Sequence, residues 1–237
     1  MGLKYQLCGL ALALLMAGPA SADTVFVDLP DFTTPFTVDR TVDGGSNTSN
    51  DEEIGQFQFF TQPGSPAYVP LSFYSFCIEP LEVITPGGPT VAYELTSLAS
   101  APTNVPGGMG ATKAAFLNEL FGRFYSDFSI AASPQLGAAL QVAIWEIVRE
   151  DSSNPFNLDA GLVQFSNFFN DPGSVVKSTA ASMLAALNGA GPQVNNIFAL
   201  TNVGAQDVLI QLTPEPSTFL LLGSALTFLG FRRRRRS

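Results

Sequence analysis

The chain contains no histidine. This absence excludes Ser-His-Asp and Cys-His nucleophilic catalysis, and it removes a common ligand of catalytic zinc sites. Acidic residues are frequent enough for a two-carboxylate sugar hydrolase, but their spacing singles out no pair. We therefore expect a protein that is not an enzyme, with no catalytic residues, no metal ion and no cofactor.

Cysteine is scarce as well, because only Cys8 and Cys77 are encoded. Cys8 lies in an N-terminal segment with one cation, Lys4, an apolar run over residues 7–17 and small residues up to Ala22. This layout predicts a signal peptide over residues 1–22, removed by signal peptidase after Ala22. An uncleaved N-terminal anchor is the alternative, although the run is shorter than the ~20 apolar residues of a spanning helix.

Removal of the signal peptide would leave Cys77 as a single thiol in an oxidising compartment, where it has no internal disulfide partner. An odd thiol in a secreted protein indicates intermolecular pairing or special chemistry. The alternative is an inert, buried cysteine that packs as a small hydrophobic residue.

The C-terminal end carries three features in a fixed order. A Pro-Glu-Pro sequence precedes a short apolar stretch over residues 217–231, and five arginines follow it. We expect a short transmembrane helix whose arginines stay on the cytoplasmic side. The residues of this predicted signal are Pro214, Glu215, Pro216, Arg232, Arg233, Arg234, Arg235 and Arg236.

This order resembles the PEP-CTERM sorting signal of Gram-negative bacteria. The resemblance implies export, anchoring in the inner membrane through the C-terminal helix, and processing by an exosortase, a membrane-embedded cysteine protease. Sorting in that family accompanies exopolysaccharide and biofilm production. The implied destination is the cell surface, if the processed protein stays attached, or the extracellular matrix, if it is shed; the sequence leaves both alternatives open. The expected organisation is a signal peptide (1–22), an extracellular domain (23–213) and the sorting signal (214–237).

The region between the two targeting segments is strongly acidic. Without Lys4, the five arginines and Glu215, the 11 basic and 20 acidic residues fall to 5 and 19, a net charge of −14. Such a domain repels nucleic acid and anionic lipid, so nucleic acid is not an expected partner.

Hydrophobic periodicity predicts an α+β fold, a strand-rich sandwich or barrel with an inserted helical subdomain of about three helices. Segment 68–79 is the clearest strand and is expected to be central, with 91–98 paired to it across a Pro-Gly-Gly-Pro turn. Segment 43–53 is expected to be a polar loop, with calcium binding through its acids as an alternative. The other expected strands span 24–29, 36–42, 54–60, 194–200 and 207–213, and the helices span 111–128, 133–149 and 174–188.

Two short motifs resemble those of the Cys-Gln thioester domains (TQXA-like) of bacterial surface adhesins. One is Phe76-Cys77-Ile78-Glu79, and the other is residues 140–145, Leu-Gln-Val-Ala-Ile-Trp. The resemblance implies an internal thioester between Cys77 and Gln141, shielded from water by Phe76 and Trp145. Leu140 stands where the family often has Thr, and Glu79 where it usually has Asp.

These observations predict an exported surface or biofilm-matrix protein that acts as a covalent adhesin. Its thioester would acylate an amine or hydroxyl on a surface target or an exopolysaccharide. The alternative is a non-covalent structural protein of the extracellular polysaccharide matrix, with no thioester. The identity of the target and the oligomeric state stay open at this stage.

Overall fold

The computed structural model describes residues 23–29, 36–82, 84, 87–102, 108–150 and 155–212. The predicted signal peptide and the sorting signal from Pro214 onward lie outside the described residues. Within the described ranges no helix is long and apolar enough to cross a membrane.

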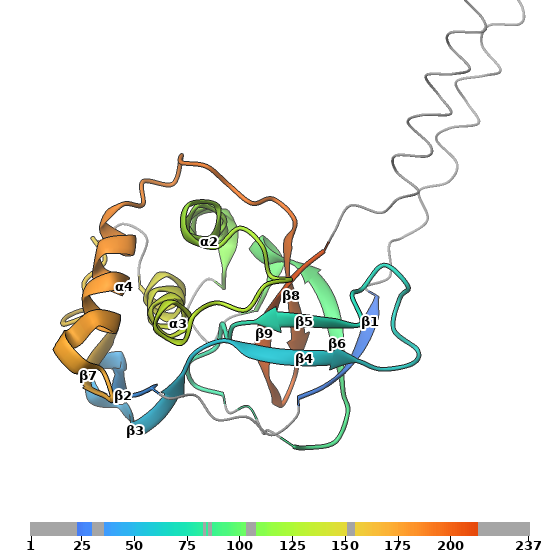
Figure 1. The fold of residues 1–237 in the computed structure, drawn as a ribbon, viewed down its shortest axis with the longest axis horizontal. Coiled ribbons are helices and arrows are strands. Elements are labelled where there is room, and N and C mark those ends of the chain that lie inside the picture. The colour runs from blue at the N-terminus through green and yellow to red at the C-terminus, as the bar shows by residue number, and fades with distance from the viewer. Residues whose placement is uncertain are drawn as a thin grey trace, which may run out of the picture.

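The described chain is a mixed α+β fold, as the sequence predicts. Six strands form a near-barrel, and three form a separate sheet (Figure 1). The near-barrel has the strand order β5 (Ser72–Ser75), β4 (Phe57–Thr61), β1 (Thr24–Asp28), β6 (Val91–Ser97), β8 (Ile197–Asn202) and β9 (Ala205–Gln211). All its neighbouring pairs are antiparallel.

The second sheet has the order β3-β2-β7, with β3 at Asn47–Ile54, β2 at Phe36–Val42 and β7 at Val163–Phe169. Three α-helices lie within the described ranges: α2 (Gly110–Phe124), α3 (Pro134–Arg149) and α4 (Val175–Ala185). Short 3-10 turns occur at η1 (Asp43–Gly45), η2 (Leu98–Ser100) and η3 (Pro172–Ser174).

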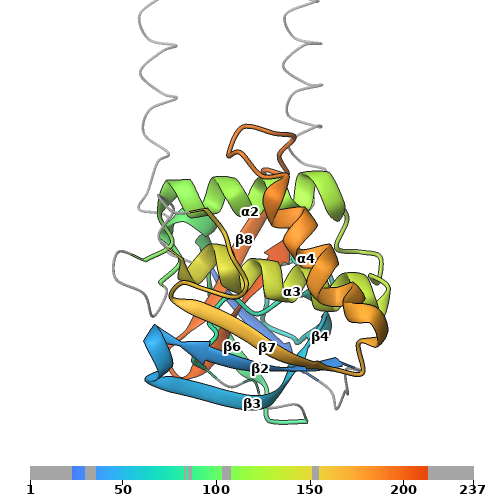
Figure 2. The same ribbon diagram turned by 90° about the vertical axis from the view of Figure 1, so that its left-hand side faces the viewer.

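Helix α3 is buried all round. Every residue from Gly137 to Arg149 is buried, because α3 lies between α2 on one side and the β2-β3-β7 sheet on the other, with α4 packed across it (Figure 2). A helix with apolar residues on all faces is typical of such a central position. Its start agrees with the sequence, since the Ser133 hydroxyl accepts a hydrogen bond from Leu136 N–H and Pro134 follows it.

Two sequence predictions for the strands are wrong. Residues 47–53, predicted as part of a loop, belong to strand β3, which pairs with β2 along its length. This edge strand exposes most of its side chains, so it carries no hydrophobic alternation. The strand β6 pairs with β1 and β8 rather than with the segment 68–79. Local turn residues do not specify such non-local pairing.

The predicted long strand 68–79 is also shorter than expected. Its regular part, β5, ends at Ser75 and pairs with β4. The chain then continues beside β9 at the opposite end of the strand order, where Cys77 pairs with Val208. This crossing closes the near-barrel. The strand β7 was not predicted, because Val163–Phe169 has no clear alternation and lies between two helices.

Gly122 on α2 marks a close backbone approach. A Cβ atom there would lie 2.2 Å from the carbonyl oxygen of Pro192. We expect Gly122→Ala to destabilise the fold by about 1–3 kcal/mol through overpacking, although alanine is the better helix former. Urea unfolding measures the change. Ala111→Gly, at an exposed position of α2, is the control and should cost less than about 1 kcal/mol. A Gly122→Ala variant more stable than wild type would contradict the close approach.

Candidate functional site

The main chain of Cys77 turns its hydrogen-bonding groups away from β9. On the β9 side the neighbouring residues make the bonds: Leu209 N–H donates to Phe76 O, and Ile78 N–H donates to Asp207 O, both at 3.0 Å. In an antiparallel pair the residue between two such bonds presents its own N–H and C=O to the other side. For Cys77 that side has no strand, because β4 pairs only as far as Ser75.

The side chain of Gln141 takes the place of the missing strand. Cys77 N–H donates to Gln141 Oε1 at 3.0 Å, and Gln141 Nε2 donates to Cys77 O at 2.8 Å. Both residues are buried. One primary amide therefore satisfies two main-chain groups that would otherwise be unpaired in the core. The structure brings the two residues of the predicted pair into direct contact; the covalent bond between them stays a prediction.

Phe76 packs on the face of its strand opposite to that of Cys77. Its ring contacts the aromatic residues of α2 and the following turn, with centroid distances of 5.7 Å to Phe121, 6.0 Å to Tyr125 and 6.0 Å to Phe128. These rings seal the near-barrel against α2. Phe76 thus excludes water from one side of the strand that carries Cys77.

Trp145 follows Gln141 by one turn of α3 and contacts the three-stranded sheet. Its ring is parallel to that of Phe165 at 6.4 Å, and the Arg40 guanidinium lies 5.6 Å from the ring centroid. Arg40 in turn forms an ion pair with Glu52. Among the described residues Trp145 Nε1 has no hydrogen-bond partner. Trp145 therefore anchors α3, and with it Gln141, on the β2-β3-β7 sheet.

Acidic groups next to Cys77 have raised pKa values. Burial first, and then the charges of Asp207 and Glu82, raise the pKa of Glu79 to about 8. Burial also raises the pKa of Asp207 to about 7, with Glu82 adding to the effect. Sequence reasoning included Glu79 but missed Asp207, since only the register of β9 brings Asp207 beside Glu79. No group of three or more acids, cysteines or histidines among the described residues is arranged to hold a metal ion.

The thiol of Cys77 is held in its neutral form. Burial, followed by the negative charge of Glu52, raises its pKa well above the ordinary value. A neutral, buried thiol does not react with external oxidants as an exposed thiolate would. Any reaction at this site therefore depends on groups that the fold itself brings to Cys77, and the Gln141 amide contacts its main chain.

Comparison with known proteins concerns the C-terminal end only. Residues 212–236 match the model of the PEP-CTERM protein-sorting motif. This match confirms the predicted sorting motif, which implies an exported, membrane-sorted protein of a Gram-negative bacterium that is a substrate of an exosortase. No curated protein matches the chain, and neither does any solved structure. The resemblance to thioester domains has no support from these comparisons.

Replacing Gln141 tests its role in the core. We expect Gln141→Ala to lower the free energy of unfolding by about 2–5 kcal/mol, because the Cys77 N–H and C=O would both lose their partner. Urea unfolding followed by tryptophan fluorescence measures the loss. The matched control is Gln135→Ala, at an exposed position in the first turn of α3, which should change stability by less than about 0.5 kcal/mol. Equal stability of the two variants would contradict the strand-replacing role.

The raised pKa of Glu79 predicts a dependence of stability on pH. A carboxyl whose folded pKa lies above its unfolded value binds its proton more tightly in the folded state. Its contribution is complete below about pH 4.5 and is lost as the pH rises through about 8. We expect the wild type to unfold at lower urea at pH 9 than at pH 5, with a flatter profile for Glu79→Gln.

At pH 9 the Glu79→Gln variant should exceed the wild type in stability by about 1–3 kcal/mol. Glu53→Gln, at an exposed position on β3 of the other sheet, is the control and should keep the wild-type profile. Identical profiles for wild type and Glu79→Gln would show that Glu79 titrates normally.

Proposed function

We propose that this chain is a covalent adhesin of the cell surface or biofilm matrix, acting through an internal Cys77–Gln141 thioester rather than as an enzyme. The observation that supports the proposal is the contact between the Gln141 amide and the main chain of Cys77 in a buried site. The sorting motif supplies the setting, with signal peptidase and an exosortase as processing partners.

Formation of the bond is a condensation without an external reagent. The sulfur of Cys77 attacks the amide carbon of Gln141, the C–N bond breaks, and the nitrogen leaves as ammonia with the thiol proton. The Cys77 N–H already donates to Oε1, so it would stabilise the negative charge that develops on this oxygen. Because Nε2 leaves as ammonia, Cys77 O would lose the hydrogen bond that Nε2 donates to it.

The site suits a thioester that lasts until an acceptor arrives. Burial of both residues excludes the water that would hydrolyse the bond. The raised pKa of the Cys77 thiol makes it a poorer leaving group, which slows unassisted cleavage. An amine or hydroxyl that reaches the carbonyl would become joined to Gln141, and Cys77 would be released as a thiol.

A second candidate is a non-covalent structural protein of the extracellular polysaccharide matrix. The two hydrogen bonds between Gln141 and Cys77 favour this candidate, because they stabilise the fold even if no thioester forms. In that case Gln141 is a core residue, Cys77 is inert, and the acidic surface keeps the protein soluble among polysaccharides. The two candidates differ in one covalent bond.

Intact mass spectrometry of the exported chain distinguishes them. We expect the wild-type mass to lie below the encoded mass of the processed chain by one ammonia molecule, and the Cys77→Ala variant to match its encoded mass. Methylamine should add its own mass to the wild type alone. A wild-type chain with its full encoded mass, and with Cys77 alkylated by iodoacetamide in denaturant, would contradict the thioester and favour the non-covalent role.

A further inference from the structure

The side chain of Cys77 points into the near-barrel. Directly paired residues of neighbouring strands place their side chains on the same face of a sheet. Cys77 pairs with Val208, Val208 with Leu200, and Leu200 with Leu95 on β6. Tyr93 lies two residues before Leu95 and shares its face, so Cys77 and Tyr93 both face inward.

The other wall of the near-barrel gives the same orientation. Cys77, Ser75 and Phe73 alternate along one segment, and Phe73 pairs with Phe59 on β4. Their two rings stack at a centroid distance of 5.6 Å. Phe59 and Tyr93, from opposite walls, thus belong to the same interior as the Cys77 thiol.

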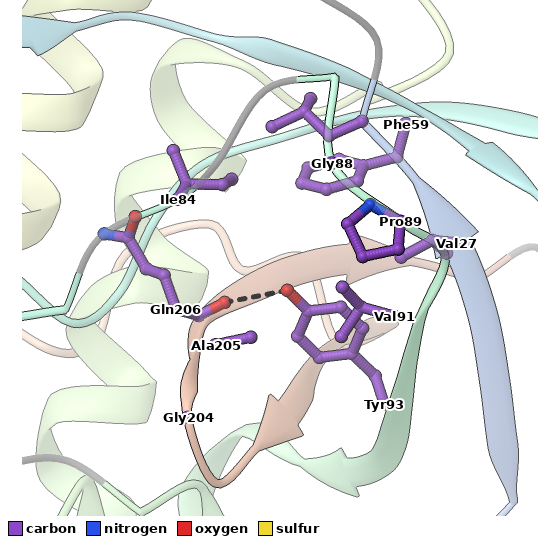
Figure 3. Close-up of a pocket in the computed structure, with 11 residues that line it drawn as sticks. Val27, Phe59, Ile84, Gly88, Pro89, Val91, Tyr93, Gly204, Ala205 and Gln206 are labelled. Carbon is purple, nitrogen blue, oxygen red and sulfur yellow. Dashed lines mark hydrogen bonds between the residues drawn. The ribbon is translucent and has the colours of Figure 1, made fainter.

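This interior opens at one end into a cavity of about 230 Å³, named here the barrel mouth (Figure 3). Val27, Phe59, Val91 and Tyr93 line it from the strands, facing Ala205 and Gln206 of the β8–β9 hairpin. The walls are mainly apolar. The Tyr93 hydroxyl donates to Gln206 O at 3.1 Å, which joins β6 to the hairpin within the lining of the mouth (Figure 3).

Tyr93 lies between the barrel mouth and Cys77. Cys77 is 1% exposed and does not line the cavity in this conformation. Along β6, Tyr93 lies between Val91, which lines the mouth, and Leu95, which is level with Cys77 through the register Leu95–Leu200–Val208–Cys77. A shift of the Tyr93 ring would therefore join the mouth to the Cys77–Gln141 site.

Acidic groups lie on the other side of the same hairpin. Glu79, Glu82, Glu94 and Asp207 line a second cavity of about 400 Å³, together with hairpin residues Asn202 and Val203. With a net charge of −14 over residues 23–213, this surface attracts cations toward the hairpin. An acidic surface beside an apolar mouth fits an ammonium group on a hydrocarbon chain.

We propose that the barrel mouth admits a primary amine carried on an apolar chain and delivers it to the Cys77–Gln141 thioester, an inference that rests on the proposed function. The apolar walls favour the neutral form of the amine, which is the nucleophile. Its nitrogen attacks the Gln141 carbonyl carbon, the C–S bond breaks, and the amine proton passes to the Cys77 sulfur. The product is an amide and a free thiol.

The test compares methylamine with hexylamine on the exported full-length chain, with amide formation followed by intact mass. We expect hexylamine to react at least about tenfold faster at equal concentration. Val91→Trp, which fills the mouth, should remove this advantage. Ala92→Trp, at an exposed position on the opposite face of β6, is the control and should keep it. Matching melting temperatures show that both variants fold.

Equal rates for the two amines, or the same advantage in Val91→Trp as in Ala92→Trp, would overturn the role of the barrel mouth while leaving the thioester intact. A wild type of full encoded mass would instead overturn the thioester. In that case N-hexylmaleimide tests the route to the free Cys77. Slower labelling of Val91→Trp than of Ala92→Trp supports entry through the mouth, and equal labelling overturns it.

Discussion

The pairing of the Gln141 amide with the main chain of Cys77 is the contact on which the described fold depends most. The near-barrel closes only because the chain after β5 leaves β4 and continues beside β9. As a result, the main-chain N–H and C=O of Cys77 have no strand partner although they are buried. Leaving two such groups unpaired in the core would cost about 2–6 kcal/mol. The side chain of Gln141, on helix α3, pairs with both groups and so avoids this energetic cost. It therefore fixes α3 against the barrel at the point where β4 no longer pairs with the strand.

The rest of α3 follows from this position. A helix that must reach the barrel at Gln141 and the second sheet at Trp145 is enclosed on all sides, which explains the small residues Gly137 and Ala143 beside its larger ones. The buried acids at its C-terminal end have partners: Glu146 accepts from Asn157 N–H, and the C-cap residue Glu150 accepts from Val163 N–H. Burial raises the pKa of Glu146 to about 7 despite that bond. The helix end is stabilised by the chain that returns to form β7.

Local patterns in the sequence predicted where the helices and strands lie better than they predicted which strands pair. The cap at Ser133, the three helices and six of the strands (β1, β2, β4, β6, β8 and β9) depend on short-range signals, and these agree with the structure. The polar strand β3, the partners of β6 and the position of β7 depend on pairing across long sequence separations, which no local residue encodes. The candidate site shows the same division. Cys77 and Gln141 were found through motif resemblance, whereas Asp207 came beside Glu79 only through the register of β9.

Both proposed functions need the Gln141 amide in the same position. A thioester needs the amide of Gln141 held at Cys77 before it can form, and a closed barrel needs the same amide in the same place. The hydrogen bond from Cys77 N–H to Gln141 Oε1 supports both functions, because it pairs a buried main-chain donor and also polarises the amide carbonyl. Only the bond from Nε2 to Cys77 O distinguishes them, since it exists in the amide and disappears with ammonia. A reactive protein would therefore give up part of its own core stability to carry the bond.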